Sequence, residues 1–239
     1  MVHGDIVFLK PELYEFFFKK VHPCIKKRYI LITHNSDYPA PGKYAHYLDD
    51  EKLIAWFGVN WDGYKHHKFH PLPIGLANKH WPHGNPDIVT EVRSNLESFK
   101  RTNLVYLTFV ENTHSERVRV KNYFSDKTFV TKGERRKPYN EYLRDLAQSK
   151  FVLCPRGAGQ DCHRQWEAWL MGAIPVMRHS SLDPVYEGLP KVYVNDWCEV
   201  TEELLKNSYE KIKDQKVATE RLFVDFWIRP ILDLQTRSH

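Results

Sequence analysis

The sequence predicts an α/β protein made of two halves, each built on a parallel sheet covered by helices. Two observations carry this prediction. Short apolar runs typical of strands alternate with amphipathic stretches along the whole 239-residue chain, which is the pattern of parallel sheets. A loop-rich region near residues 80–100 separates the first group of strands from the second. We therefore expect an N-terminal half over residues 1–96, a C-terminal half over 97–215 and a final segment over 216–239 with an apolar helical face.

In the first half, apolar runs of β type are separated by helical stripes and polar loops. Pro11 is well placed to begin a helix, and the apolar residues that follow it have helical spacing. The stretch between residues 60 and 86 is rich in His, Trp, Pro and Gly, which is loop composition. We expect strands at 6–9, 29–33, 53–59 and 73–76, with helices after Pro11 and at 44–51.

In the second half, strands and helices continue to alternate. Gly172 is expected to close one helix and Thr201 to cap another. Ser115 is a possible cap for the helix in "ENTHSERVRVKNYF". We expect strands at 104–110, 128–131, 151–154, 174–177 and 192–194, and helices at 88–99, 140–148, 162–171, 183–187 and 201–213.

Composition narrows the classes of partner. The formal charge is +5 and the pI near 8.9, but Lys and Arg are interspersed with Asp and Glu. A mixed-charge surface is therefore expected rather than a nucleic-acid site, and the mild positive balance suits a small anionic substrate. The longest apolar runs are about five residues, too short to span a membrane. With no visible signal peptide and four cysteines outside any C-x-x-C or zinc pattern, we expect free thiols and a cytoplasmic protein.

The stretch from residue 152 to 176, "VLCPRGAGQDCHRQWEAWLMGAIPV", carries the clearest chemistry. It predicts a strand, a glycine turn and a helix, with Asp161 as helix cap. Arg164 then lies in the first helical turn, where a cation opposes the helix dipole. That position is favourable if an anion binds between the helix N–H groups and Arg164. Glu167, three residues on, could accept two ribose hydroxyls. The alternative is an ordinary Arg164–Glu167 salt bridge on a solvated helix.

The same stretch resembles the signature of the exostosin-like glycosyltransferases, family GT47. The pattern is C-P-R-G, a short turn, R-x-x-E-A, apolar residues, and then I/V-P-V. The resemblance is strongest over residues 140–197 and departs from the family at 161–163, where Asp, Cys and His replace a common Gly-Ser-Phe. The matching residues are Arg156, Gly157, Arg164, Glu167, Ala168, Ile174, Pro175 and Val176.

This resemblance implies a GT-B fold, with two Rossmann-like halves facing a cleft, and a final helix that packs back across both. It also implies an inverting transfer of a sugar from UDP to a glycan hydroxyl. Arg164, with Arg156 as a second candidate, would hold the diphosphate, and Glu167 would hold the ribose. The sequence contains no D-x-D, so arginines and a helix dipole are expected in place of a metal, with no cofactor beyond the UDP-sugar.

Other residues are expected in the site only because they follow the carboxyl ends of predicted strands. Ser115 and Arg117 follow the strand at 104–110, where they could contact the diphosphate. Asp37 and then His34, just past the strand at 29–33, are the expected catalytic bases, with Asp62 a weaker third. Each could equally be a turn former. The histidines of residues 66–83 have no convincing metal spacing, and their aromatic neighbours, Trp81 among them, could stack on sugars.

The rival to an enzyme is a module that binds a nucleotide-sugar or glycan without turning it over. Its motivation is the modest length of both halves. The sequence leaves the sugar, the acceptor and the oligomeric state open.

Overall fold

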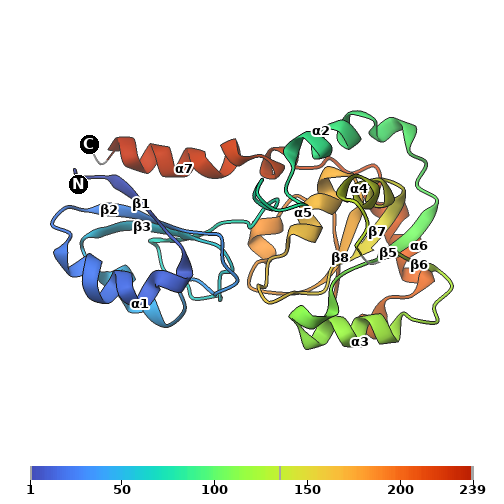
Figure 1. Cartoon of the computed structure of the whole chain (residues 1–239), viewed down its shortest axis with the longest axis horizontal. Coiled ribbons are helices and arrows are strands. Elements are labelled where there is room, and N and C mark those ends of the chain that lie inside the picture. Colours follow the sequence, from blue (N-terminus) through green and yellow to red (C-terminus); the bar gives the residue numbers. More distant parts are fainter. Residues whose placement is uncertain (1, 135, 238–239) are drawn as a thin grey trace.

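The computed structural model describes residues 2–134 and 136–237. These residues form two parallel sheets, one of four strands and one of five, each flanked by helices (Figure 1). The predicted class, α/β with two parallel-sheet halves, is confirmed.

The N-terminal sheet has its strands in chain order, all parallel. The strand expected at 73–76 is wrong, because the fourth strand lies earlier in the chain. Pro73 has no N–H to give to a ladder, and Gly75 has a φ of +63°, which strand geometry excludes. The strands are β1 (Asp5–Leu9), β2 (Tyr29–Thr33), β3 (Leu53–Gly58) and β4 (Phe69–Pro71).

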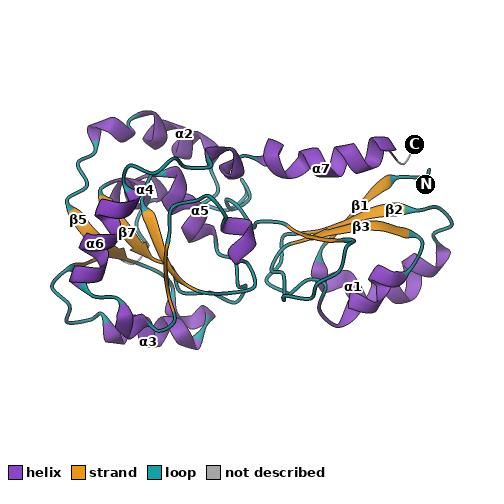
Figure 2. Cartoon of the chain, turned by 180° about the vertical axis from the view of Figure 1, so that it is seen from behind, coloured by secondary structure: helices purple, strands orange, loops and turns teal. Residues whose placement is uncertain are grey.

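The two faces of this sheet are covered from different parts of the chain. One face carries the helical segments between its strands, in an aromatic core that includes Phe18 and Trp56. The other packs against α7 (Val224–Arg237), whose Ile231 is 4% exposed. Both views show α7 along the sheet, opposite α1 (Figures 1 and 2). The helical segments on the first face are a 3-10 turn (Pro11–Leu13), α1 (Tyr14–Phe16), a π turn (Phe17–Val21) and 3-10 turns at His22–Cys24 and Gly42–Asp49.

The C-terminal sheet has the order β6-β5-β7-β8-β9, again all parallel. The chain runs outward in one direction from β5 to β6 and then returns to build the rest on the other side. The order therefore reverses between β5 and β7. The strands are β5 (Asn103–Leu107), β6 (Val130–Lys132), β7 (Ser149–Leu153), β8 (Ile174–Arg178) and β9 (Val192–Val194).

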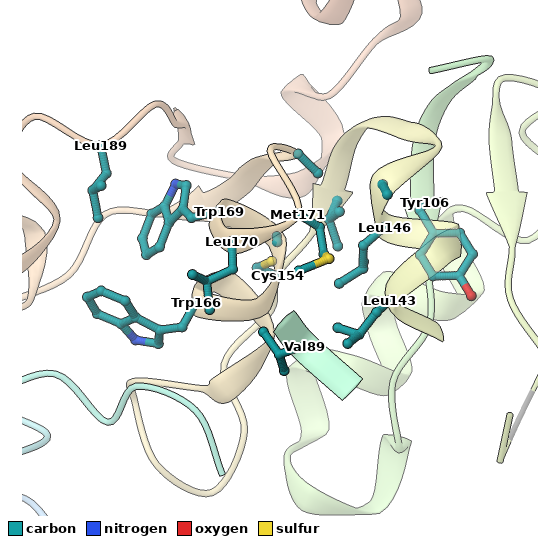
Figure 3. Packing of buried hydrophobic residues seen from close by; sticks show 14 of the residues in the cluster. Val89, Tyr106, Leu143, Leu146, Cys154, Trp166, Trp169, Leu170, Met171 and Leu189 are labelled. Atoms are coloured by element: carbon teal, nitrogen blue, oxygen red, sulfur yellow. The ribbon is translucent and has the colours of Figure 1, made fainter. Parts of the chain in front are cut away.

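Helices cover both faces of this second sheet. On one face, α2, α4 and α5 enclose a core that includes Trp166, Trp169 and Leu170 of α5 and Leu143 and Leu146 of α4 (Figure 3). The other face packs against α3 and α6. The helices are α2 (Pro86–Ser94), α3 (Ser115–Tyr123), α4 (Tyr139–Ala147), α5 (His163–Leu170) and α6 (Glu202–Ile212), with 3-10 turns at Leu96–Ser98, Glu111–Thr113, Asp183–Tyr186, Trp197–Glu199 and Thr219–Leu222.

Some of the expected helix ends are confirmed and others are wrong. Thr201 caps α6, since its side chain accepts from the Leu204 N–H at 3.1 Å, and Gly172 follows α5 with a φ of +70°. Asp161 does not cap α5, because its carboxylate is taken up by buried donors elsewhere, and Cys162 stands at the cap position. His114, not Ser115, caps α3, because its ring accepts from the Glu116 N–H.

The carboxyl ends of the two sheets face each other, and their loops are in direct contact. Asp37 accepts from the Gly159 N–H at 3.0 Å, and Asn60 accepts from the Asp161 N–H at 2.8 Å. The Asp161 carboxylate in turn accepts from the Ile74 N–H at 2.6 Å. The glycine turn after β7 is therefore hydrogen-bonded to the N-terminal half.

No helix within residues 2–134 and 136–237 is long and apolar enough to cross a membrane. Over the same residues, no group of three or more His, Cys, Asp or Glu side chains is arranged to hold a metal ion.

Candidate functional site

The candidate site lies where the strand order of the C-terminal sheet reverses. In open α/β sheets the loops at such a switch point diverge and leave room for a ligand beyond the carboxyl ends of the strands. Here the loop after β5 leads into α3, and the glycine turn after β7 leads into α5. The residues of interest are those on these two loops and in the first turns of the two helices.

Arg117 of α3 joins the two loops. Its side chain is 7% exposed and donates from Nε to the Arg156 carbonyl at 3.0 Å and from Nη1 to the Val110 carbonyl at 3.1 Å. Its Nη2 lies 3.5 Å from the Cys162 thiol. Gly157 permits this approach, because a Cβ there would be 2.8 Å from Nη2. All three nitrogens are thus bound to neutral groups.

Arg164 of α5 lies against the same aromatic ring as Arg117. The two guanidinium carbons are 5.4 Å and 5.7 Å from the centre of the Phe109 ring. The Nε of Arg164 is buried and has no hydrogen-bond partner among the described residues. Over the same residues the arginines that form ion pairs are Arg144 and Arg221. Arg117 and Arg164 therefore bring two positive charges together, and no described carboxylate lies within ion-pair distance of either. Burial is outweighed by the ionisable groups around Arg164, Tyr142 first and Glu167 among them, so the pKa of its guanidinium is raised.

The electrostatics of this pair favour an anion. Burial, and then the positive charge of Arg164, lower the pKa of the Arg117 guanidinium. Like charges in a partly buried site cost free energy that a bound anion would recover. The first turn of α5 adds to this, because its cap residue Cys162 makes no side-chain capping bond. Its thiol accepts from the Gly157 N–H instead, at 3.1 Å. The leading N–H groups of α5 thus remain available.

Glu167 does not pair with Arg164. Its carboxylate is 4% exposed and accepts from the hydroxyls of Tyr139 at 3.2 Å and Tyr142 at 2.9 Å, both on α4. Burial, and then the charge of Glu167, raise the pKa of Tyr142. The described residues contain no Arg164–Glu167 ion pair, so the solvated salt bridge that the spacing also allowed is wrong. The two side chains of this helix face thus have different neighbours: Arg164 lies on the Phe109 ring, and Glu167 binds the two tyrosines of α4.

The remaining residues expected at the donor site lie further out. Arg156 is exposed, and its guanidinium reaches only carbonyls of its own loop, those of Gly157 at 3.4 Å and Ala158 at 3.3 Å. It is the Arg156 backbone that holds Arg117. Ser115 is exposed at the start of α3. The structure thus brings Arg117, Gly157 and Arg164 together, with Arg156 and Ser115 at the edge.

The two expected bases lie at the carboxyl end of β2, as predicted by position. Asp37 is exposed, and one carboxylate oxygen accepts from Gly159. His34 is more constrained. Its Nε2 lies 3.0 Å from the Pro73 carbonyl, which can only accept, and its Nδ1 accepts from the Asn35 N–H at 2.9 Å. Both ring nitrogens of His34 are therefore in use. Asp62 accepts from the Gly42 and Tyr64 N–H groups and shapes its own turn.

Sequence reasoning missed three residues of the site. Phe109 was assigned to the strand at 104–110, but β5 ends at Leu107 and leaves Phe109 in the loop. An aromatic residue at a strand end was the available signal. Tyr139 and Tyr142 have the i, i+3 spacing of one helix face, yet nothing local links them to Glu167.

The four cysteines are free, and burial raises the pKa of the Cys154 thiol to about 12.

Fold and site together define a two-half α/β protein with two arginines on one aromatic ring at the switch point of its second sheet, neither of them ion-paired among the described residues. The family model described as the RXYLT1 C-terminal domain matches residues 96–230, more than half of the chain. The chain therefore belongs to this family.

The chain is similar to a curated protein, ribitol-5-phosphate xylosyltransferase 1 of Danio rerio. Identity is 32% over 94 residues, covering 34% of this chain and 21% of that protein, so the chain spans about a fifth of its relative. Solved structures resemble it weakly. A glycosyltransferase from Rickettsia africae ESF-5 has a TM-score of 0.45 at 10% identity, over 95% of this chain and 77% of its own. A GtfA/B complex has a TM-score of 0.44 at 10% identity, over 99% and 58%.

Proposed function

We propose that the chain is an inverting glycosyltransferase of the exostosin-like GT47 type, which moves a sugar from UDP to an acceptor hydroxyl. The observation that carries this proposal is the pair of guanidinium groups on Phe109 at the switch point, neither of them ion-paired among the described residues. Such a site suits a diphosphate. The family and the name of the Danio rerio relative support transfer of a sugar.

In this proposal the diphosphate lies between the N-terminus of α5 and Arg164. The orphan Nε of Arg164 would donate to a phosphate oxygen, and Arg117 would contribute charge while holding the loops. Glu167 would take the ribose hydroxyls. An ionised carboxylate has about four lone-pair positions, and the two tyrosines use one bond each. A ribose can therefore join or replace them.

The relative's name suggests the sugar and the acceptor. By its name, the Danio rerio protein transfers xylose and acts on ribitol 5-phosphate. UDP-xylose is therefore the first donor to test, and ribitol 5-phosphate is the first acceptor. Glucuronate, galactose and arabinose are the other donors to compare, because the contacts described above concern the nucleotide and do not select the sugar.

The chemistry would be a single displacement. The acceptor oxygen attacks the anomeric carbon as the bond to UDP breaks, and the arginines and the helix dipole stabilise the departing diphosphate. Of the two bases predicted from the sequence, Asp37 has a second carboxylate oxygen without a hydrogen-bond partner among the described residues. His34 has both nitrogens engaged.

UDP binding tests the donor site. Wild type should be stabilised against heat by UDP, and Arg164→Ala should raise the Kd about 10- to 100-fold, the worth of a charged hydrogen bond. Glu167→Gln distinguishes binding of the ribose from binding of the phosphates. It should weaken UDP about tenfold but leave inorganic pyrophosphate unchanged. An unaltered UDP-induced shift in either variant would show that the donor binds elsewhere.

A second candidate, binding without turnover, is favoured by one observation. Both expected bases hold the fold together: Asp37 binds the glycine turn and His34 binds the Pro73 carbonyl. Release of UDP from the four UDP-sugars distinguishes the two candidates. Saturable UDP binding with no release from any donor, in the presence or absence of ribitol 5-phosphate, would favour the binding module.

A further inference from the structure

His163 is the first residue of α5 and directly precedes Arg164. Its ring faces the other half of the molecule, where its Nδ1 lies 2.7 Å from the Gly75 carbonyl oxygen. The residue thus joins the proposed donor helix to the segment that leaves β4. It was not among the residues selected from the sequence.

The partner of Nδ1 decides which ring nitrogen carries the proton. A carbonyl oxygen can only accept, so Nδ1 must donate, and in the neutral ring Nε2 then carries the lone pair. Nε2 has no hydrogen-bond partner among the described residues. In its neutral form His163 therefore presents a free Nε2 lone pair beside the N-terminus of α5.

The segment whose carbonyl orients the ring is itself fixed to the start of α5. Next to the Gly75 bond, the Ile74 N–H donates to the Asp161 carboxylate at 2.6 Å, so consecutive residues are clamped to the start of α5. Gly75 has a φ of +63°, a conformation that glycine adopts without strain. Asp161 is buried and also accepts from Trp166 and Tyr186, which fixes the clamp to the core.

An exposed row of rings leads from solvent to His163. The His83 ring lies 6.4 Å from that of His163, and the Trp81 ring stacks on His83 at 6.1 Å. Trp81 is 52% exposed. Flat apolar faces of this kind suit the C–H face of a sugar or polyol, and the row carries no carboxylate. An acceptor lying on it would have a hydroxyl directed toward the start of α5.

We propose that His163 is the general base of the reaction, a role that rests on the proposed function. Nε2 takes the proton of the acceptor hydroxyl as its oxygen bonds to the anomeric carbon. The bond from that carbon to the β-phosphate oxygen breaks, and its electron pair leaves with UDP. The imidazolium then returns its proton to solvent. The reaction consumes a UDP-sugar and an alcohol and yields a glycoside, UDP and one proton.

The decisive variant is His163→Asn. The asparagine amide can still donate to the Gly75 carbonyl, but it has no nitrogen in place of Nε2. UDP release from UDP-xylose, UDP-glucuronate, UDP-galactose and UDP-arabinose is measured with water and with ribitol 5-phosphate as acceptor. The kcat should fall about 10²–10⁴-fold. The rise in Tm that UDP induces should stay within roughly 1 °C of the rise measured for wild type. His67→Asn, the same change at an exposed histidine outside the site, should leave kcat unchanged.

The outcomes separate this inference from the proposed function. His163→Ala should regain part of its rate with added imidazole, which a merely structural defect would not do. If wild type turns over a donor and the kcat of His163→Asn stays within roughly threefold of the wild-type kcat, His163 is not the base, because loss of a general base costs far more. Asp37→Asn and His34→Asn then identify the base. If wild type binds UDP but releases it from none of the donors, the proposed function and this inference both fail.

Discussion

At the residue scale, the two arginines on Phe109 have different roles. Arg117 donates to the Val110 and Arg156 carbonyls and so holds two loops. Arg164 has no hydrogen-bond partner among the described residues, and its Nε is buried. A buried charge without a partner is unfavourable for folding. In the proposed function, the position of Arg164 serves to bind an anion.

This difference predicts opposite effects of the same substitution. Arg164→Met should leave the free energy of unfolding unchanged or raise it by about 1 kcal/mol, because it removes the repulsion and the orphan donor and can pack on Phe109. Arg117→Met should lower it by about 2–4 kcal/mol, because two carbonyls lose a charged donor. Denaturant unfolding without ligand measures both. A loss of more than about 2 kcal/mol in Arg164→Met would mark Arg164 as structural.

At the element scale, the glycine turn between β7 and α5 faces two neighbours. A Cβ on Gly157 would be 2.8 Å from Nη2 of Arg117, inside the C-terminal half. A Cβ on Gly159 would be 2.9 Å from Oδ1 of Asp37, in the N-terminal half. The turn thus shapes the proposed donor site on one side and fits the contact between the halves on the other.

Alanine at each glycine should separate these two roles. Gly157→Ala displaces the end of one side chain, so we expect weaker UDP binding, about fivefold or more, with a stability loss near 1 kcal/mol. Gly159→Ala meets both Asp37 and Asn60, so we expect a larger loss of stability, about 1–3 kcal/mol. Calorimetric titration with UDP and thermal unfolding measure the two effects. Equal effects of both variants on both measurements would contradict this assignment.

At the scale of the whole molecule, hydrogen bonds between loops, apolar residues such as Trp61, Ile74 and Leu76, and one helix join the halves. Asn60, 2% exposed and with a φ of +53°, accepts from the Asp161 N–H and donates to the Ser36 carbonyl. On the opposite side α7 covers the N-terminal sheet, and its Trp227 also packs against the core of the C-terminal half. The relative position of the two proposed substrate sites depends on these contacts.

Asn60→Ala should therefore weaken the molecule as a whole. It leaves a buried N–H and a buried carbonyl unpaired and places alanine at a positive φ, for a total of about 2–4 kcal/mol. For a chain of this size Tm should fall by roughly 5–15 °C. Asn78→Ala is the matched control, since its exposed amide donates only to Asn35 and its loss should stay near 0.5 kcal/mol. Differential scanning calorimetry of both variants tests the difference.

Sequence patterns predicted most of the fold because strands and helices are local. Apolar runs and helical spacing located β2, β9 and α6 within a residue or two. The strand predicted at 73–76 is wrong because an apolar stretch does not reveal its tertiary partners. In the structure the Ile74 N–H donates to Asp161 of the other half. Asp161 itself was assigned to a cap by its spacing, although three buried donors and one backbone N–H hold it elsewhere.

The sequence by itself determined that a strand at 151–154, a glycine turn and a helix at 162–171 follow one another, with Arg164 in the first helical turn. The structure confirms this order, with β7 at Ser149–Leu153 and α5 at His163–Leu170. That order is local, and periodicity reports local geometry. Only the tertiary structure decided the partners: Phe109 and Arg117 beside Arg164, the tyrosines of α4 on Glu167, and the Gly75 carbonyl that sets the free nitrogen of His163. These contacts join segments up to 88 positions apart, and they depend on how the sheets order and face each other.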